Sequence, residues 1–355
     1  MIQEGLAKLD LEMPKKISSD VEVFYNPIMK FNRDIAVLLL QSIDKKNMQI
    51  ADPLAGSGIR TIRFLLELSE DKIKSITIND YDKKSIENIQ KNLKLNKIKD
   101  KVFLENREAS KFMLESTGFD YIDIDPFGFP GPFLDSAVKR LARDGILAVT
   151  ATDTAALSGT YPSTCQRKYW SNPLRNDNMH EIGLRILARR VQLVAASYEK
   201  CLIPIFSHAT EHYMRIYFRN QKSNKALKQM FNNFGNLFFC TKCLARSTKE
   251  PCNCKKYETT GELWLGQLWD EQLVQKMLQN NKQKENEKFL QTIALESKIN
   301  VPYIYDLHKI AKHYKINLTK KEDVIKKLNA SPTHISGTAI RTEASIKEIV
   351  KSYAG

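Results

Sequence analysis

Residues 48–60 read MQIADPLAGSGIR, an apolar run followed at once by a glycine-bearing turn. Met48–Asp52 has the length and composition of a buried strand, and Ile59–Glu70 continues with apolar residues at helical spacing. Gly56 and Gly58 allow the backbone to pass close to a ligand, and the start of the helix offers unpaired N–H groups. The stretch therefore predicts a strand, a ligand-binding turn and a helix.

Short apolar runs alternate with longer amphipathic ones between Met48 and Thr152, which is typical of βα units around a parallel sheet. We expect further strands at Ser75–Asn79, Val102–Asn106, Tyr121–Ile124 and Gly145–Thr152, and helices at Lys83–Asn96, Ala109–Ser116 and Pro132–Leu141. A long helix over Asn178–Leu202 is expected next, then a hairpin of Phe206–Thr210 and Tyr213–Arg219 with its turn at Glu211–His212. The pattern predicts a doubly wound α/β core.

The 355 residues suffice for two domains, and 55 Lys and Arg against 41 Asp and Glu give a formal charge of +14. Such a charge favours a polyanionic partner, although a lysine-rich composition that only keeps a protein in solution has the same charge. No apolar run approaches the roughly 18 residues of a membrane span, and Met1–Lys16 has no leader pattern. We therefore expect a cytoplasmic protein without membrane contact, acting as a monomer.

Acidic residues follow the second and third predicted strands. Asp80 is placed to accept both ribose hydroxyls of an adenosine, and Arg60 stands where a dinucleotide fingerprint would have its third glycine. Glu108 and Ala109 are candidates for the adenine amino group, and Glu108 equally suits a carboxylate at a helix start. These features favour S-adenosylmethionine and do not exclude NAD.

The fourth strand ends in Asp125-Pro126-Phe127-Gly128, at the sheet edge where open α/β folds bind ligands. The motif suits methylation of an amino group. The exocyclic amine of a base such as guanine is a poor nucleophile, so an enzyme must accept its N–H groups and aim its nitrogen at the methyl group of the donor. The Asp125 carboxylate and the Pro126 carbonyl provide acceptors, and Phe127 can stack on the base. A simple strand-ending turn is the alternative reading of these residues.

The chain resembles the archaeal and eukaryotic tRNA (guanine-26 N2)-dimethyltransferase family over nearly its whole length. The resemblance is carried by Val23–Pro27, Asn32–Asp34, Asp52–Arg60, Asp125–Gly128, Thr150–Ala155, Arg167–Tyr169, His180–Arg185 and Ser207–Arg215. It implies a class I, Rossmann-like methyltransferase that converts guanine 26 of tRNA to N2,N2-dimethylguanosine.

The resemblance also assigns residues to the site. It implies that S-adenosylmethionine is bound by Arg33, Asp52, Gly56, Gly58, Arg60, Asp80, Glu108 and Ala109. It implies that Asp125 is the catalytic acid and that Phe24 and Phe127 flank the inserted base. Glu108 departs from the aspartate usual in the family, and Phe129 departs from its usual small residue, so Phe129 either narrows the pocket or packs beneath it.

Four cysteines, Cys240, Cys243, Cys252 and Cys254, lie in one short window, and four thiolates suit a closed structural zinc site. Reduced thiols or a disulfide pair are the alternatives. We place a catalytic domain at residues 1–221 and a smaller zinc-containing α+β domain that binds tRNA at residues 222–355. Exposed lysines such as Lys309, Lys312 and Lys315 are candidates for phosphate contacts or form a solvated face.

Two other functions fit parts of this pattern. Methylation of another amino group, in DNA, ribosomal RNA or a protein amide, uses the same Asp-Pro-Phe motif. A non-catalytic RNA-binding scaffold on a decayed methyltransferase fold is disfavoured, because Gly56, Gly58, Asp80 and Asp125 are all present.

Overall fold

The computed structural model describes residues 1–11, 23–210, 212–221 and 223–353. The chain forms two compact units. Unit 1 comprises residues 1–151, 194–203 and 217–222, and unit 2 comprises residues 152–193, 204–216 and 223–355. These units are defined by contacts between residues. The boundary predicted between residues 221 and 222 separates a catalytic part from a tRNA-binding part, and this division stays a prediction.

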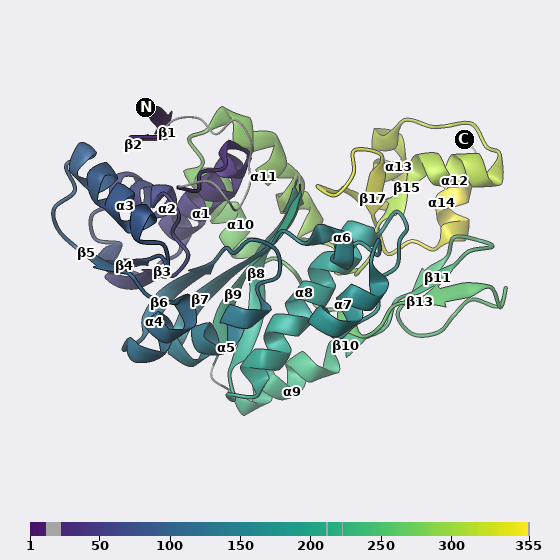
Figure 1. The fold of residues 1–355 in the computed structure, drawn as a ribbon. Coiled ribbons are helices and arrows are strands. Elements are labelled where there is room, and N and C mark those ends of the chain that lie inside the picture. The colour runs from purple at the N-terminus through teal and green to yellow at the C-terminus, as the bar shows by residue number, and fades with distance from the viewer. Residues whose placement is uncertain (12–22, 211, 222, 354–355) are drawn as a thin grey trace. The chain divides into compact units, whose positions relative to one another are not determined.

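A seven-stranded sheet has the order β5-β4-β3-β6-β7-β9-β8 (Figure 1). Its strands are β3 (Met48–Asp52), β4 (Ile73–Asn79), β5 (Val102–Glu105), β6 (Phe119–Ile124), β7 (Leu141–Ala151), β8 (Cys201–Thr210) and β9 (Tyr213–Gln221). The β3–β4, β4–β5, β3–β6 and β6–β7 pairs are parallel. The predicted doubly wound α/β core is therefore confirmed.

Helices connect the parallel strands, as the alternating pattern predicts. Besides β3 to β7, residues 1–151 of unit 1 form β1 (Ile2–Glu4), β2 (Ala7–Leu9), η1 (Pro27–Met29), α1 (Lys30–Ser42), α2 (Ile59–Glu67), α3 (Lys83–Leu95), α4 (Ala109–Glu115) and α5 (Gly131–Arg140). α2 ends at Glu67 rather than Glu70, because Leu68 is already extended. No helix within the described ranges is long and apolar enough to cross a membrane.

The strand order reverses beside β3. The chain first adds β4 and β5 on one side of β3 and later adds β6 and β7 on its other side. Loops that leave the carboxyl ends of β3 and β6 therefore diverge, and ligands of open α/β sheets bind in the crevice between such loops. The glycine turn follows β3, and Asp125 follows β6.

The helix predicted over Asn178–Leu202 is wrong at its C-terminal end. α8 covers Met179–Ala196, and Cys201 begins strand β8. Cys201 and Leu202 are fully buried, and a short apolar run has the same composition whether it continues a helix or begins a strand. The two predicted hairpin strands lie within β8 and β9, and Glu211 of the predicted turn lies outside the described residues.

Unit 2 combines helices with short strands. Besides α8 it contains α6 (Thr154–Leu157), α7 (Pro162–Tyr169), α9 (Asn224–Asn232), β10 (Phe234–Gly235), β11 (Phe238–Cys240), β12 (Arg246–Ser247), β13 (Tyr257–Thr259), β14 (Leu263–Trp264), α10 (Glu271–Asn280), α11 (Lys284–Glu296), β15 (Tyr305–Asp306), α12 (Leu307–Tyr314), α13 (Lys321–Leu328), β16 (Ser331–Pro332), β17 (Ala339–Arg341) and α14 (Ile346–Ser352). The strands pair as β10-β14, β12-β11-β13 and β15-β17-β16. The C-terminal part is thus α+β, as predicted.

A buried ion network ties α8 to the C-terminal strands within unit 2. Arg341 donates to Glu181 at 2.8 and 2.9 Å and to Glu296 at 2.8 Å, and Arg185 donates to Glu181 at 2.8 Å. All four side chains are at most 1% exposed. A buried charge needs a partner of opposite charge. Ion pairing within this network therefore accounts for the presence of Glu181 and Arg185 at these buried positions.

Candidate active site

The glycine turn and Asp80 lie at the carboxyl ends of the neighbouring strands β3 and β4. One carboxylate oxygen of Asp80 accepts the Gly56 N–H at 2.8 Å, and the other accepts the Asp82 N–H at 2.9 Å. Burial raises the pKa of Asp80, and it outweighs the lowering by these backbone donors. The carboxylate expected to bind ribose is thus fixed on the turn expected to bind the cofactor.

Both glycines of the turn have left-handed backbones, with φ of +55° at Gly56 and +74° at Gly58. A Cβ on Gly56 would lie 3.0 Å from the Phe24 carbonyl oxygen, which also accepts the Ser57 N–H at 3.1 Å. A Cβ on Gly58 would lie 3.0 Å from Ile89. The chain itself, at Phe24 and Ile89, therefore occupies part of the space beside the two glycines that the sequence predicts for a ligand.

Glu108 is the N-cap residue of α4. Its two carboxylate oxygens accept the N–H groups of Ser110 and Lys111 at 2.9 and 2.7 Å. Burial raises the pKa of Glu108, but these donors lower it more, so it lies below the usual value. The cap explains an acid at this position, and Ala109 next to it is buried. A contact of Glu108 with adenine remains a prediction.

Parallel pairing of β3 with β6 brings two buried carboxylates together. Ala51 lies opposite Ile122, so the next residues along each strand, Asp52 and Asp123, are neighbours. They are 4% and 1% exposed. Burial, followed by the charge of Asp123, raises the pKa of Asp52 to about 7, although the Thr61 hydroxyl donates to it at 2.8 Å. One of these carboxyl groups is therefore poised to hold a proton near neutral pH.

Arg60 places its guanidinium among these acids and the proposed catalytic acid. Its Nη2 pairs with Asp125 Oδ2, and its Nη1 lies 3.5 Å from Asp123 Oδ2. Nη1 also donates to Asn32 Oδ1 at 2.9 Å. One guanidinium thus faces the carboxylates of Asp52, Asp123 and Asp125, so the cluster is anionic when all three are ionised. Such a cluster favours a cationic ligand.

Asp125 itself has one carboxylate oxygen committed and one available. Its side chain is 18% exposed and follows β6 directly. Arg60 holds Oδ2, and Oδ1 has no hydrogen bond or ion pair among the residues that the structure describes. The Pro126 carbonyl is adjacent along the chain. Arg60 is therefore a partner of the proposed catalytic acid, which the resemblance did not imply.

Arg33 is held by a residue that the sequence analysis did not single out. Glu4, in the N-terminal hairpin, accepts from Arg33 Nε at 2.7 Å and from Nη2 at 2.5 Å. Glu4 also accepts from Arg63 Nη1 at 2.9 Å and from the Tyr25 hydroxyl at 3.1 Å. Glu4 thus joins α1 to α2, the helices that carry Arg33 and Arg60. No local sequence pattern reports such a contact.

Two aromatic side chains close over each other near the glycine turn. The rings of Phe24 and Phe127 are 4.3 Å apart between centroids and lie edge to face at 72°. Phe127 is 55% exposed. Phe129 lies against Gly131, where a Cβ would come within 2.0 Å of its ring, so it packs at the start of α5.

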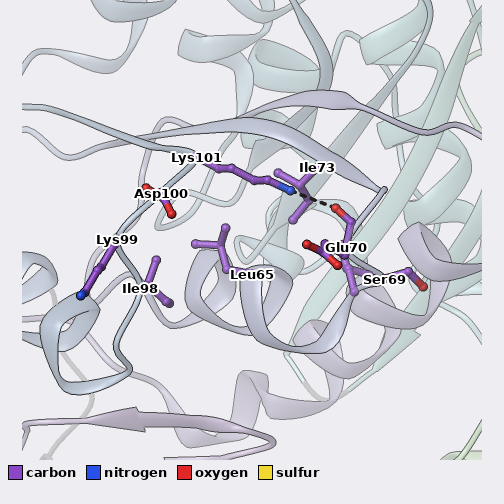
Figure 2. Close-up of a pocket in the computed structure, with 9 residues that line it drawn as sticks. Leu65, Ser69, Glu70, Ile73, Ile98, Lys99, Asp100 and Lys101 are labelled. Carbon is purple, nitrogen blue, oxygen red and sulfur yellow. Dashed lines mark hydrogen bonds between the residues drawn. The ribbon is translucent and has the colours of Figure 1, made fainter.

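A hollow of about 300 Å³ lies elsewhere in unit 1 (Figure 2). It is lined by residues 65, 68–70 and 73 on one side and residues 98–101 on the other, and Lys101 donates to the Glu70 carbonyl at 2.9 Å. Ile73 and Lys101 stand at the amino ends of β4 and β5. The hollow is therefore at the opposite sheet edge from Asp80 and Asp125, and it contains none of the predicted site residues.

The four clustered cysteines converge in unit 2. The sulfur atoms of Cys240, Cys243, Cys252 and Cys254 all lie within 4.8 Å of one another. The Cys243 and Cys252 sulfurs are 3.6 Å apart, and the Cys243 N–H donates to Cys240 Sγ at 3.3 Å. Zn–S bonds of about 2.3 Å in a tetrahedron require S–S distances of about 3.8 Å. The donor set thus fits a tetrahedral metal ion.

The reversed strand order, the glycine turn with Asp80, and the acid at the end of β6 are the features of a Rossmann-like methyltransferase. The solved structure of Trm1 from Pyrococcus horikoshii in complex with S-adenosyl-L-methionine is similar, with a TM-score of 0.88 and 33% identity over 99% of this chain and 98% of that chain.

Sequence comparison gives the particular family. The family model of N2,N2-dimethylguanosine tRNA methyltransferase matches residues 5–354. The tRNA (guanine(26)-N(2)/guanine(27)-N(2))-dimethyltransferase of Aquifex aeolicus is 40% identical over 99% of this chain and 95% of its own length. The tRNA (guanine(26)-N(2))-dimethyltransferase of Methanobrevibacter smithii is 40% identical over 99% and 97%. The chain therefore belongs to the N2,N2-dimethylguanosine tRNA methyltransferase family.

Proposed function

We propose that this protein transfers two methyl groups in succession from S-adenosylmethionine to the exocyclic N2 of guanine 26 in tRNA. The observation that carries the proposal is the available Oδ1 of Asp125 at the carboxyl end of β6, in a chain similar over 99% of its length to a methyltransferase solved with this cofactor. The substrate follows from family membership.

Asp125 and Pro126 prepare the amine for attack. Asp125 Oδ1 and the Pro126 carbonyl accept the two N–H groups of the guanine amine, which turns its nitrogen toward the methyl group. The amine becomes cationic as it attacks, and the anionic cluster around Arg60 stabilises that charge. After the first transfer Asp125 takes the released proton and loses it to solvent, so that its carboxylate is again ready to accept the one remaining N–H and the second proton. The second transfer needs only the room for one methyl group.

The residues around the glycine turn fit the cofactor. When bound, S-adenosylmethionine supplies an electrophilic methyl group on a sulfonium. Asp80 would accept from the ribose hydroxyls, Ala109 would border the adenine with Glu108, and the guanidinium of Arg33 would bind the methionine carboxylate. Two nitrogens of Arg33 are engaged by Glu4 and the Asn26 carbonyl, which leaves Nη1 without a hydrogen bond among the described residues. Asp52, when ionised, would contribute negative charge that favours the sulfonium.

The two phenylalanines must separate before a base can lie between them. A base stacked between two rings requires centroids roughly 7 Å apart, because each carbon contact is roughly 3.5 Å. The Phe24 and Phe127 centroids are 4.3 Å apart. We propose that the exposed Phe127 moves outward with the inserted base and that Phe24, whose carbonyl is bonded to Ser57, stays in place.

We propose that the metal of the cysteine cluster is a structural zinc ion. Four sulfur ligands leave no open position for catalysis, and thiolates prefer Zn²⁺ among the common divalent ions. The cluster joins the end of β11 to the two loops that contain Lys242 and Asn253. Residues 238–254 are too few to form a hydrophobic core of their own, so a metal ion would hold them together. Residues 222–355 then form the zinc-containing part that binds tRNA through exposed lysines, and residues 1–221 carry the methyl transfer.

Labelled methyl transfer tests the proposal against its alternatives. The protein should be incubated with methyl-labelled S-adenosylmethionine and, separately, with tRNA, ribosomal RNA, DNA and a protein extract. We expect label in tRNA only, recovered as N2-methyl- and N2,N2-dimethylguanosine. Label in another pool would identify a different amino-group methyltransferase. Absence of both label and cofactor binding would favour a scaffold. We propose that the protein works on tRNA in the cytoplasm, and its monomeric state stays a prediction.

A further inference from the structure

Trp170 is an exposed side chain at a position that favours glycine. It caps the C-terminus of α7 with φ of +57° and ψ of +38°, in the left-handed region that bulky residues rarely adopt. Its side chain is 55% exposed, whereas the other two tryptophans, Trp264 and Trp269, are 3% exposed. The indole therefore adds backbone strain and buries little apolar surface.

Two arginines of α8, Arg189 and Arg190, fix the position of Trp170. The guanidinium carbon of Arg190 lies 3.5 Å from the ring centroid, and Arg190 Nε donates to the Lys168 carbonyl at 3.0 Å. Arg189 Nη1 donates to the Trp170 carbonyl at 3.3 Å. One face of the ring is thus covered by a cation from α8, and the exposed surface is on the remaining side. A ring fixed in this way is a flat platform whose orientation is set in advance.

Two arginines beside the ring, Arg167 and Arg190, are not neutralised by acids in the described ranges. Arg167, one turn earlier on α7, is exposed, and its only hydrogen bond among the described residues is to the Thr164 hydroxyl at 3.3 Å. Neither Arg167 nor Arg190 has a carboxylate at ion-pair distance within the part of the chain that the structure describes. Arg189 is different, because Glu262 pairs with it at 2.5 Å.

We propose that this surface binds the tRNA substrate by stacking one unpaired base on the open face of Trp170. The surface, here called the Trp170 platform, consists of Tyr161, Arg167, Trp170 and Arg190. Proteins recognise single-stranded RNA by stacking bases on aromatic rings and by pairing cations with phosphates. Tyr161, 60% exposed at the other end of α7, provides a second ring, and Arg167 contacts a phosphate. The identity of the RNA rests on the proposed function.

Trp170→Gly isolates the ring from the fold. Glycine adopts the left-handed backbone without strain, which offsets the lost contact of the ring with Arg190, so the variant should unfold at about the same temperature as the wild type. Loss of one stacked base should weaken the binding of an unmodified tRNA transcript roughly 5- to 150-fold. Trp170→Phe keeps a flat ring and should bind nearly as the wild type does. Phe103→Ala removes an aromatic side chain that is 60% exposed on β5, and it should leave tRNA affinity unchanged.

Fluorescence reports on the same contact directly. Since Trp170 is the exposed tryptophan of the three, a stacked base should quench the emission of the full-length protein, and Trp170→Phe should abolish the quenching while it still binds tRNA. Polyglutamate at matched charge should not quench. Equal quenching by polyglutamate would show that the surface reads charge alone, which would overturn base stacking.

Methyl transfer separates this inference from the proposed function. If the wild type methylates tRNA and Trp170→Gly does so with the same KM for tRNA, the platform proposal fails and the proposed function stands. If the wild type neither binds nor methylates tRNA, both fail. A raised KM for tRNA in Trp170→Gly, with kcat and cofactor affinity unchanged, is the result that we expect.

Discussion

Asp52 should make the protein less stable as the pH rises from 4 to 7. Folding raises the pKa of Asp52 from 3.8 to about 7, because the side chain is buried beside Asp123. Between these values the folded protein retains a proton that the unfolded chain has lost, so raising the pH favours unfolding. Below pH 3.8 the group has no effect, and above pH 7 the full penalty persists. At about 1.4 kcal/mol for each pH unit, the penalty reaches about 4 kcal/mol.

Asp52→Asn removes this proton equilibrium and keeps an acceptor for the Thr61 hydroxyl. Equilibrium urea unfolding of both proteins should be compared at pH 5 and pH 8. The gain in unfolding free energy from the substitution should be about 3 kcal/mol larger at pH 8, since two of the three pH units of the shift lie above pH 5. Asp100→Asn, an exposed carboxylate in the same unit, serves as the matched control and should show no such difference.

An equal effect of Asp52→Asn at both pH values would refute the reasoning, because it would mean that Asp52 is already ionised in the folded protein at pH 5. Saturating S-adenosylmethionine should shrink the difference between the two pH values, since a nearby positive charge favours the ionised carboxylate.

Three further perturbations test other parts of the structure. Arg60→Lys keeps the charge but loses the two-nitrogen contact that joins Asp125 to Asn32, so kcat measured at saturating cofactor should fall 10-fold or more; an unchanged kcat would separate Arg60 from the acid. Glu181→Ala leaves Arg341 buried without one of its carboxylates and should lower the unfolding free energy by about 3–5 kcal/mol in urea titrations, and a change under 1 kcal/mol would show that the network is not coupled to folding. Cys243→Ser should reduce bound zinc, measured by elemental analysis, and should lower the melting temperature to that of the chelator-treated wild type; full zinc content in the variant would contradict the four-sulfur site.

The sequence contained the local parts of this fold. The strand Met48–Asp52, the turn at Gly56 and the helix from Ile59 were predictable because apolar spacing and turn residues act over a few positions. The end of α8 was not, because Cys201–Ile203 is apolar enough for either a helix or a strand. Periodicity fails where a buried helix is followed closely by a buried strand.

The site residues could be predicted from the sequence more readily than the residues that they contact. Asp125 and Arg60 were both named from motifs, but their contact joins positions 65 residues apart. Glu4 reaches Arg33 across 29 residues from a hairpin with no distinctive motif. Asp52 and Asp123 are neighbours because β3 and β6 pair in parallel in one particular register. That register cannot be predicted from a single sequence.

The central claim is that the Asp125 carboxylate accepts the guanine amine and aims its nitrogen at the methyl group. The most direct test is single-turnover methyl transfer to a tRNA transcript by Asp125→Ala, which removes both carboxylate oxygens, with the cofactor dissociation constant measured on the same preparation. We expect a rate at least about 100-fold below the wild type, the lower range for loss of a general base, with unchanged cofactor affinity. A rate within threefold of the wild type would contradict the claim.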